Sequence, residues 1–486
     1  MARVVILGAG IAGHTAAMVL RRTLPKEHVV CVVSPKPDYN WIPSNIWVGV
    51  GRMAREKVVV PLAPIYARLG IEFIQASATE IHPAGNPNHP GPYIVATPTT
   101  PGAATESVEV AYDWLINATG PKVRFDRTPG LGPDGGHTHS VCTDRHAVDA
   151  ATALDAAIQR MKAGERQTLV VGMGHGTCTC EGAAFEYTFN VEHELRRHGV
   201  RDLADLVYLT NEAELGDFGV DGLVIRNGGF HTPSSVFAGS FFAERSVQAI
   251  LGAHVQAIEP GLIRYETLDG VDHEQRYDFA MLLPPFTGVG LKAFGAQGED
   301  ITDTLFAPSG FTKVDADYTP KPYEAWKPTD WPSTYRNPTW KNVFAVGIAF
   351  APPHPISRPR TSPRGTVISP APPRTGMPSA SMARAVAENI ADMILGRATE
   401  PERLSSMANM GAACVASAGS GFWAGNAVAM TMFPIVPDYT RWPGAGRDER
   451  FTFGEVGTAG HWIKLVLHHL FLYKARAKPF WWMVPE

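Results

Sequence analysis

The feature that most constrains the fold is the N-terminal stretch RVVILGAGIAGHTAA, residues 3–17. It is an apolar strand followed by a G-x-G-x-x-G pattern at Gly8, Gly10 and Gly13, and then by small residues that suit a helix. The first glycine permits a tight turn, the second lets the main chain approach a pyrophosphate, and the third lets the helix pack against the strand. The helix N-terminus attracts phosphate. We therefore predict a dinucleotide-binding domain at this end of the chain.

Three further strand ends refine the choice of cofactor. The strand in HVVCVVSPK ends at Ser34, where an acidic residue usually holds the ribose, and a hydroxyl can make a weaker hydrogen bond there. The strands in YDWLINATGP (112–121) and NVFAVGIAF (342–350) end in small residues. In this order they favour FAD over NAD as the tightly held cofactor. The residues expected to contact it at these two strand ends are Ala118, Thr119, Gly120 and Gly347.

Composition excludes several classes of protein. A chain of 486 residues is long enough for two or three domains. The hydrophobic fraction of 45% and the net charge of −4 indicate a globular protein without the basic excess of a nucleic-acid binder. We see neither a signal peptide nor an apolar run of about 18 residues, so no transmembrane helix is expected. Prolines gather in residues 319–378, which predicts a loop-rich region.

A second glycine loop occurs in VVGMGHGTCTCEGAAFEY, residues 170–187. An apolar strand runs into three glycines, as a second dinucleotide site would require. Cys178 and Cys180 then stand where a nicotinamide cofactor would need small, inert neighbours. The glycine spacing is therefore typical of a nucleotide-binding loop, whereas the two cysteines indicate thiol chemistry.

The cysteine segments together resemble those of the sulfide:quinone oxidoreductases, a branch of the two-dinucleotide-domain flavoproteins. The matching segments surround Cys142, Cys180 and Cys414, and a fourth is NWIPSNIWVGVG (40–51). Residues that match the family patterns are Ser140, Cys142, Thr143 and His146; Cys180, Gly182, Ala184, Phe185 and Glu186; Cys414, Val415, Ala416 and Gly419; Pro43, Ser44, Asn45, Trp47, Val48, Val50 and Gly51; and Ser34. The resemblance extends from residue 3 to about 478.

The resemblance implies a redox chemistry. Cys180 and Cys414 would form a disulfide that HS⁻ attacks, giving a persulfide and a thiolate, and the electron pair would pass to FAD and then to a membrane quinone. Cys142 would lie nearby, and in some family members the matching cysteine binds FAD covalently. His146 and Glu186 would handle protons or tune the thiols. The second glycine loop would be repurposed, so no NAD and no metal are expected, and Cys178 is interpreted as a bystander.

The chain departs from the family pattern at several positions. Asp217 stands where a histidine is common, and Ala380 stands in place of a glutamate. The late K-T-G element reads Arg374-Thr375-Gly376, which keeps a positive charge near the flavin but changes its geometry. An insertion, HPISRPRTSPRGTVISPAPP (354–373), precedes it.

The C-terminal stretch 461–486 predicts an amphipathic helix. Apolar residues recur at i, i+3, i+4, i+7 and i+8. The stretch is too short to span a bilayer with its basic residues, so we expect it to lie on the membrane surface; a helix packed on the core is the alternative. By the resemblance it anchors the protein beside a quinone channel lined in part by residues 422–437, with Phe433 and Trp47 as quinone contacts. The residues are Ile463, Val466, Leu467, Leu470 and Phe471 on the apolar face; Lys464, His468, Lys474, Arg476 and Lys478 as a basic rim; and Trp462, Tyr473, Trp481 and Trp482 at the interface.

These observations predict an α/β protein with two Rossmann-like dinucleotide-binding domains of the disulfide-reductase type and a C-terminal membrane-surface segment. The FAD-binding domain would comprise residues 1–165 and 330–400, the second domain 166–290, and the membrane and quinone region 401–486. We expect a sulfide:quinone oxidoreductase that binds peripherally to a prokaryotic membrane, forms homo-oligomers and binds no nucleic acid.

Three other functions stay open. The flavin subunit of a flavocytochrome c sulfide dehydrogenase would use a cytochrome partner and lack the basic amphipathic tail. A type II NADH:quinone oxidoreductase would need an open second glycine loop and an acidic ribose residue, for which Glu212 and Glu214 are available. A membrane-bound sulfur carrier or redox sensor would cycle its thiols without turnover.

Overall fold

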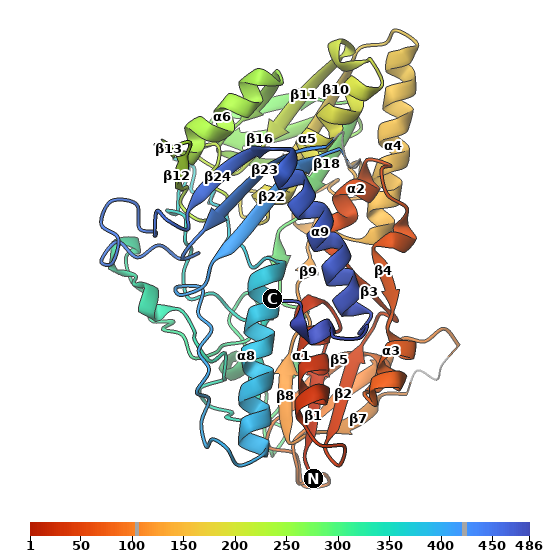
Figure 1. Cartoon of the computed structure of the whole chain (residues 1–486), viewed down its shortest axis with the longest axis vertical. Helices are drawn as coiled ribbons and strands as arrows, with labels where there is room; N and C mark the ends of the chain where they lie inside the picture. Colours follow the sequence, from red (N-terminus) through yellow and green to blue (C-terminus); the bar gives the residue numbers. More distant parts are fainter. Residues whose placement is uncertain (103–105, 420–424) are drawn as a thin grey trace.

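The N-terminal domain is built on a sheet whose central strands are parallel. The computed structural model describes residues 1–102, 106–419 and 425–486 (Figure 1). The sheet contains, in spatial order, β21 (Val343–Ala345), β8 (Trp114–Asn117), β1 (Arg3–Leu7), β2 (Val29–Ser34), β5 (Glu72–His82), β6 (Tyr93–Pro98) and β7 (Val108–Ala111), with β20 (Lys292–Ala293) also on β5. Strands β21 to β5 are parallel, and the apolar sequences of β21, β8, β1 and β2 are buried on both faces. The strand order reverses between β1 and β8, and ligands bind at such switch points in open α/β sheets.

Two helices pack side by side on this sheet. Helix α1 (Ile11–Thr23) follows β1, and α8 (Gly376–Ile394) comes from the C-terminal half of the chain (Figure 1). The N-terminal sheet and its helix layer are therefore completed by β21 and α8, two elements that follow the whole second domain in sequence. Apart from β21 and the start of α8, residues 319–378 form loops and short 3-10 helices. This confirms the loop-rich region predicted from the prolines.

The second domain repeats the parallel design on a smaller scale. Its sheet has the order β14 (Val247–Ile250), β11 (Ala204–Leu209), β10 (Gln167–Met173) and β18 (Phe279–Leu283), all parallel. Helix α5 (Glu181–Arg197) follows β10, and α4 (Asp144–Lys162) precedes it. Around this sheet lie α6 (Ser234–Glu244) and an antiparallel sheet of β15 (Ala253–Glu259), β16 (Leu262–Thr267) and β17 (Asp272–Arg276).

A third sheet joins two distant parts of the chain. Its order is β13 (Phe230–Pro233), β12 (Val224–Asn227), β24 (Phe453–Gly457), β23 (Asn426–Met432) and β22 (Ala412–Ala418). Residues 224–233, which lie within the predicted second domain, thus share a sheet with the C-terminal region. Helix α5 packs against β22, and the C-terminal helix α9 (Thr458–Ala475) crosses β22 and β23 (Figure 1).

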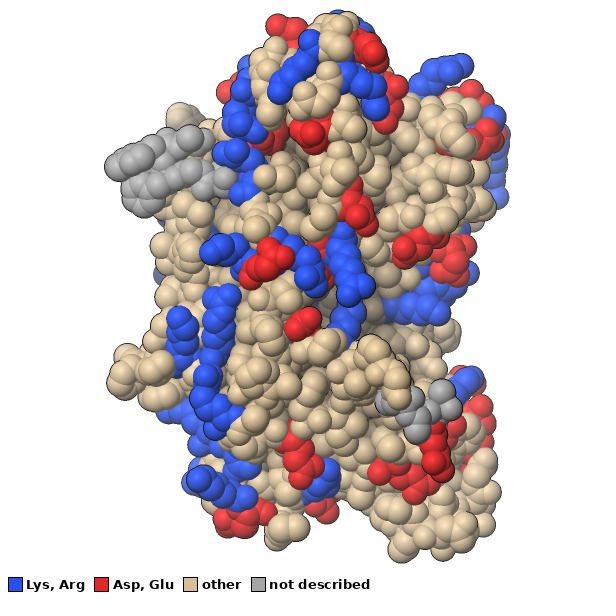
Figure 2. Space-filling model, turned by 90° about the vertical axis from the view of Figure 1, so that its right-hand side faces the viewer, with Lys and Arg blue, Asp and Glu red and all other residues tan. Residues whose placement is uncertain are grey.

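The remaining elements are short connections. They are β3 (Asp38–Asn40), α2 (Asn45–Gly49), β4 (Val59–Pro61), α3 (Leu62–Leu69), β9 (Lys122–Val123), β19 (Phe286–Thr287) and α7 (Thr302–Leu305). Over the described residues, every helix is too short or too polar to cross a bilayer. On the side that carries α2, α3 and α4, cationic and anionic side chains are interspersed (Figure 2).

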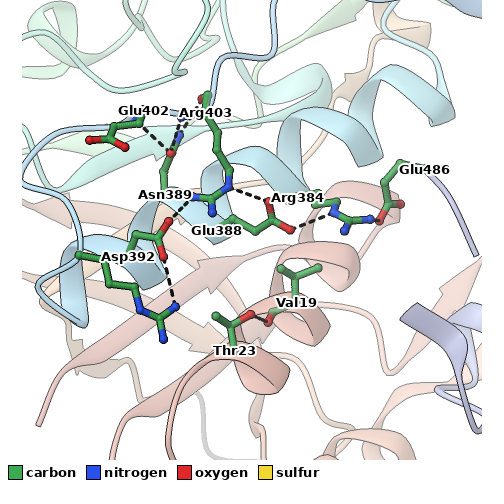
Figure 3. A network of polar contacts seen from close by, with 10 residues as sticks. Val19, Thr23, Arg384, Glu388, Asn389, Asp392, Glu402, Arg403 and Glu486 are labelled. Atoms are coloured by element: carbon green, nitrogen blue, oxygen red, sulfur yellow. Dashed lines mark hydrogen bonds and ion pairs between the residues drawn. The ribbon is translucent and has the colours of Figure 1, made fainter. Parts of the chain in front are cut away.

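A polar network on α8 holds the end of the chain in place. Arg384 donates to Glu388 at 3.0 Å and lies 3.9 Å from Glu486, and Arg403 reaches both Glu388 and Asp392 (Figure 3). Glu486 also pairs with Lys474 of α9 at 2.6 Å. The C-terminal residue Glu486 therefore connects α9 to α8 and holds the end of α9 against the N-terminal domain.

Candidate functional site

The turn between β1 and α1 has the shape of a pyrophosphate cradle. Gly8 has a φ of +95°, and a Cβ there would lie 2.4 Å from the carbonyl oxygen of Ala118. A Cβ on Gly13 would lie 2.0 Å from the Gly8 oxygen, so this position requires glycine for the helix to approach the strand. Gly10 has no heavy atom within 4 Å of the same position. The open side of the turn is therefore at Gly10, where a phosphate would approach.

A second helix N-terminus adjoins this cradle. A Cβ on Gly376, the first residue of α8, would lie 3.1 Å from the Cδ1 of Ile11, the first residue of α1. Gly347, with a φ of +66°, would place a Cβ 3.1 Å from Ala12. Thr375 is the N-cap residue of α8. Two helix starts with unsatisfied N–H groups thus meet at one place, which suits an anionic dinucleotide cofactor.

The other predicted cofactor contacts border the same site. The side chain of Asn117 accepts hydrogen bonds from the N–H and hydroxyl of Thr119, at 3.1 and 2.8 Å, which fixes the turn through Ala118 and Gly120. Ser34 is buried, and its hydroxyl donates to the carbonyl oxygen of Lys36 at 3.3 Å. The residues at this site fit a bound FAD.

Two of the predicted reactive cysteines meet at the start of α5. Cys180 is the N-cap residue of that helix and adopts a left-handed conformation with a φ of 77°. Cys414 lies on β22, and its Sγ is 3.2 Å from the position of a Cβ on Gly182. The absence of a side chain at Gly182 therefore leaves room for the Cys414 sulfur beside the first turn of α5. Sequence-distant β22 and α5 bring the two cysteines to one site.

Burial keeps these thiols protonated in the reduced protein. It raises the pKa of Cys180 to about 12, with an added contribution from the neighbouring Glu181 carboxylate. Burial likewise raises the pKa of Cys414 to about 11, and Glu186 raises it further while Lys464 lowers it. All five cysteines are free thiols in this structure. A thiolate released here is a high-energy species, so it transfers its electron pair readily.

Cys142 lies near this pair. A charge on Cys142 raises the pKa of Cys180, and burial raises the pKa of Cys142 itself to about 11. Its N–H donates to the hydroxyl of Ser140 at 3.1 Å, and the Asn45 amide donates to the preceding carbonyl of Val141 at 3.2 Å. The side chain of Asn45 therefore positions the loop that carries Cys142.

Cys178 occupies a different environment. It is fully buried, and its thiol donates to the carbonyl oxygen of Leu283 at 3.1 Å. Burial raises its pKa well above the ordinary value. The side chain is part of the wall between α5 and the second sheet.

Glu186 is tied to the sulfur site through a buried ion pair. Its Oε2 lies 2.8 Å from the Nζ of Lys464, and its Oε1 accepts the N–H of Ser417 at 3.1 Å. Lys464 also donates to the carbonyl of Val415 at 3.2 Å. Because Val415 and Ser417 follow Cys414 on β22, the pair fixes both the strand and the charges beside that thiol. Burial raises the pKa of Glu186 even though Lys464 lowers it.

His146 is held elsewhere. Its Nε2 lies 3.7 Å from a carboxylate oxygen of Asp134, and its ring meets Phe125 edge to face at 5.8 Å. Burial lowers its pKa, and the charges that act on it are those of Asp134, Asp149, Lys36 and Asp144. The structure therefore brings Glu186 to the cysteines and places His146 among a separate set of charges.

Arg374 is a fixed cation beside Cys180. Its guanidinium donates to the carbonyl oxygens of Ile348 and Phe350, at 3.0 and 2.5 Å, and lies 4.5 Å from the centre of the Phe311 ring. Burial lowers its pKa to about 10, while a charge on Cys180 raises it. The arginine thus connects the segment after Gly347 with Cys180.

Helix α9 corrects one sequence expectation. Lys464, His468 and Lys474 were predicted to form a solvent-facing basic rim, but all three face the protein. The hydroxyl of Ser44 and Nδ1 of His468 are 2.8 Å apart, and Lys474 pairs with Glu486. These side chains point inward because their partners lie on elements remote in sequence.

The outward face of α9 is apolar. Ile463, Val466 and Leu470 are 49, 53 and 40% exposed, while Leu467 and Phe471 are half-buried. The inward polar positions 461, 464 and 468 repeat at i, i+3 and i+7, a signal available in the sequence and missed there. His461 also belongs to this face, with its Nδ1 2.5 Å from the hydroxyl of Ser417.

The two predicted quinone contacts differ in their surroundings. Trp47 is fully buried under α9, edge-on to His468 with ring centres 5.8 Å apart. Phe433 packs edge-on against Trp442 and Phe451, at 6.2 and 6.1 Å. Residues 422–424 of the predicted channel segment lie outside the described residues.

The second glycine loop is covered by the insertion. The N–H of Ser369 donates to the Gly176 carbonyl and that of Ala371 to the Cys178 carbonyl, both at 2.8 Å. A Cβ on Gly176 would lie 2.7 Å from the carbonyl oxygen of Val367, and its own N–H donates to His254 at 3.0 Å. The N–H groups of Gly174 and Gly176, which a phosphate would use, are bonded to the Leu283 carbonyl and to His254.

The two acidic residues that could hold an NADH ribose, Glu212 and Glu214, differ in their exposure to solvent. Glu212 is fully buried and accepts hydrogen bonds from Thr210 at 2.9 Å and from the N–H of Phe218 at 2.8 Å. Glu214 is exposed. The buried position of Glu212 removes it as a ribose ligand.

Comparison with known proteins agrees with this geometry. Residues 2–201 match the pyridine nucleotide-disulphide oxidoreductase family model. The structure of Plasmodium falciparum NDH2 superposes with a TM-score of 0.61 at 11% identity over 98% of this chain and 96% of the other, a similarity of fold. The fold and cysteine site thus define a flavin-dependent oxidoreductase of the two-dinucleotide-domain class.

The nearer relatives narrow this class. The sulfide-quinone reductase of Aquifex aeolicus is 29% identical over 97% of this chain and 91% of its own length. Its crystal structure superposes with a TM-score of 0.76 at 27% identity, covering 98% of this chain and 92% of the other. The mitochondrial sulfide:quinone oxidoreductase of Dictyostelium discoideum is 25% identical over 41% of this chain and 40% of its own length. The chain is a homologue of the sulfide-quinone reductases.

Proposed function

We propose that this protein oxidises sulfide to zero-valent sulfur and delivers the electrons through FAD to a membrane quinone. The observation that carries the proposal is the placement of both cysteines at the start of α5: Cys180 is its N-cap residue, and the Cys414 sulfur lies 3.2 Å from the position of a Cβ on Gly182. A homologue of sulfide-quinone reductases with this pair has the two sulfurs that the reaction needs.

The resting oxidised enzyme would contain a Cys180–Cys414 disulfide. HS⁻ attacks one sulfur; a new S–S bond forms as the old one breaks, and the other cysteine leaves as a thiolate. Arg374 and Lys464 stabilise negative charge at the two thiol positions, because each cation lowers the pKa of its neighbouring cysteine. Bound FAD supplies the two-electron acceptor that connects this thiolate with the quinone.

Residues at the two helix starts would hold the cofactor. The β1–α1 turn with Gly10 on its open side would take the pyrophosphate, and Ser34 the ribose. The turn 118–120, Gly347 and the start of α8 would surround the rest. A covalent bond to Cys142 is part of the proposal, since that thiol lies near Cys180. Flavin that stays with the wild-type polypeptide after acid denaturation, and separates from Cys142→Ser, would support the bond; flavin that separates from both excludes it.

The C-terminal segment would place the enzyme on the membrane surface. The exposed apolar side chains of α9 and of the residues after it suit contact with a membrane surface. They are Trp462, Ile463, Val466, Leu470, Phe480, Trp482 and Met483. This set favours a membrane quinone over the cytochrome partner of a flavocytochrome, and it leaves association between copies as an expectation.

Vesicle flotation tests the membrane proposal. Val466→Glu places a charge on an exposed position of α9, so it is expected to leave the unfolding temperature unchanged and to abolish flotation with lipid vesicles. Val236→Glu is the matched control, because Val236 is also exposed, at 58%, but lies on α6. Equal flotation of the wild type and Val466→Glu would contradict a membrane role for α9.

The central test is anaerobic. Purified holoenzyme is mixed with sulfide while flavin absorbance is followed, and a soluble quinone analogue is then added. We expect bleaching and recovery in the wild type, no bleaching in Cys180→Ser or Cys414→Ser, and normal bleaching in Cys31→Ser, since Cys31 is a buried core thiol of β2. Bleaching by NADH and indifference to sulfide would instead support an NADH:quinone oxidoreductase. Bleaching without recovery by quinone would indicate a sulfur carrier or sensor.

A further inference from the structure

Glu181 is a buried acid that the mechanism above does not use. It follows Cys180 directly as the first residue of α5, and it is 0% exposed. Neither carboxyl oxygen has a hydrogen-bond partner among the described residues. An ionised carboxylate in such a position would lose its hydration without compensation, so the group is retained as a neutral acid.

Two further acids lie beside it on one turn. The Oε2 of Glu181 is 3.4 Å from the position of a Cβ on Gly219. The N–H of Gly219 donates to Asp217 at 2.9 Å, and that of the adjacent Phe218 donates to Glu212 at 2.8 Å. The turn 217–219 therefore gathers three carboxyl groups within a few residues.

The groups that face Glu181 and Glu212 are acidic or neutral, and the Arg447 guanidinium lies near Asp217. The hydroxyl of Tyr208 donates to Glu212 at 3.2 Å, and Ser357 donates to Asp217. Besides burial, the carboxylates of Glu212 and Asp217 raise the pKa of Glu181, and the amide of Asn211 lowers it. Burial also raises the pKa of Glu212 to about 7 and that of Asp217 above its ordinary value. The charged and titratable groups near the set from the other packed elements are Cys178, Cys180, Tyr208, Asp221, Tyr323 and Arg447.

The far side of the set reaches a cavity. Asp217 lines a cavity of about 240 Å³, together with Glu214, Asp221, Tyr439 and Arg447. Glu214, Asp221 and Tyr439 are exposed, so the cavity communicates with solvent. Its polar lining suits several ordered water molecules. The carboxyl groups thus lie between the Cys180 site and water.

We propose that Glu181, Glu212 and Asp217 form a proton-transfer chain from the Cys180 site to this cavity. The proposal rests on the sulfide oxidation proposed above. When sulfide becomes bound to a cysteine sulfur, its S–H bond breaks, the electron pair stays on sulfur, and the proton goes to a carboxyl oxygen of the chain. A neutral carboxyl accepts a proton on one oxygen and releases one from the other, so the proton leaves through Asp217 to water. The two electrons leave through FAD to the quinone.

Glu181 differs from Glu186 in this respect. Glu186 is paired with Lys464, which opposes its protonation, whereas no lysine or arginine is among the groups that shift the pKa of Glu181. Proton transfer is most efficient when the pKa of the group lies near the operating pH, and burial raises the pKa of Glu181 from its ordinary value. The two acids on α5 therefore divide the tasks: Glu186 fixes charge beside Cys414, and Glu181 exchanges protons beside Cys180.

Single-turnover bleaching of holoenzyme by sulfide tests the chain. Anaerobic stopped-flow measurements between pH 6 and 9 compare the wild type with Glu181→Gln, which keeps size and neutrality but cannot transfer the proton. We expect bleaching about 10²-fold slower, with a changed pH profile and a larger solvent isotope effect. Glu181→Asp should recover part of the rate. The matched control is Glu192→Gln, a buried acid of α5 that pairs with Arg196 away from the cysteines.

The outcomes separate the two proposals. A wild type that sulfide does not bleach refutes the proposed function itself. A bleaching wild type with Glu181→Gln within twofold of it at every pH refutes the chain alone, as does an equal loss in Glu192→Gln. Asp217→Asn, at the cavity end, provides an independent measurement: a rate loss supports the exit through the cavity, and an unchanged rate overturns it. Flavin content and unfolding temperature verify that each variant is folded.

Discussion

Removal of the Lys464 charge should destabilise the protein in a strongly pH-dependent way. Lys464→Met keeps most of the aliphatic side chain but leaves Glu186 buried without its cation. The side chains are 12 and 7% exposed, with Nζ and Oε2 2.8 Å apart, so solvent cannot replace the lost partner. Breaking such a buried pair costs about 3–5 kcal/mol when the remaining group stays charged.

Protonation of Glu186 limits this cost. From an ordinary value of 4.5, neutralising the carboxyl at pH 7 requires 2.5 pH units, or about 3.4 kcal/mol. At pH 5 the same step requires about 0.7 kcal/mol. The lysine variant should therefore lose about 3 kcal/mol of stability at pH 7 and under 1 kcal/mol at pH 5. The sign follows because the variant binds a proton on Glu186 in the folded state, so its stability falls as pH rises above 4.5.

Urea unfolding at pH 5 and pH 7, followed by flavin release and circular dichroism, measures the difference. The double variant Lys464→Met, Glu186→Gln should recover most of the stability at pH 7, because no buried charge remains. Lys474→Met is the matched control, because it breaks the other buried ion pair of α9, with Glu486. This pair is distant from the cysteines, so Lys474→Met should leave the rate of flavin bleaching by sulfide unchanged. A loss of stability independent of pH, or one that Glu186→Gln does not relieve, would refute the electrostatic reasoning.

Three further predictions follow from individual contacts. Gly13→Ala should purify with little flavin, because its methyl group would lie 2.0 Å from the Gly8 oxygen. Gly239→Ala on α6 is the control, since its methyl group meets no atom within 4 Å, and it should keep its flavin. The flavin absorbance of each purified variant measures the difference. Wild-type stability should fall with rising pH above 4.5 relative to Glu181→Gln, by up to about 1.4 kcal/mol per pH unit, since the folded protein holds the Glu181 proton more tightly; parallel urea midpoints across pH would contradict this. Arg374→Met should raise the pKa of Cys180 further and slow its alkylation by iodoacetamide at pH 8.5, as read by mass spectrometry; faster alkylation would show that the guanidinium does not stabilise the thiolate.

The sequence predicted what local patterns determine. The G-x-G-x-x-G spacing identified the β1–α1 turn because each glycine has a steric reason within a few residues of itself. The strands before ATG and before Gly347 were predicted from their apolar residues, and β8 and β21 lie with β1 in one parallel sheet. The apolar spacing after residue 461 predicted a helix, and α9 spans Thr458–Ala475.

What the sequence could not predict depends on contacts between remote segments. No periodicity places β22 against α5, so the meeting of Cys180 and Cys414 was available only through a family resemblance. The direction of Lys464 and His468 was wrong because Glu186 and Ser44, their partners, lie hundreds of residues earlier in the chain. From the sequence alone, a basic residue beside an apolar stripe is expected to face solvent. It can face the interior only when a buried acid, here Glu186, lies opposite it.

The insertion 354–373 covers the glycine loop that carries Cys178 and Cys180. A dinucleotide site needs free main-chain N–H groups and an uncovered helix start. Here the N–H groups of Gly174 and Gly176 are bonded within the protein, Ser369 and Ala371 donate to carbonyl oxygens of the loop, and Val367 fills the space beside Gly176. The insertion continues directly into Arg374, which lies beside Cys180, so one segment both covers the second glycine loop and supplies a cation to the thiol. The N-cap and first positions of α5 carry a cysteine and a buried acid. Cys180 and Glu181 occupy those two consecutive positions.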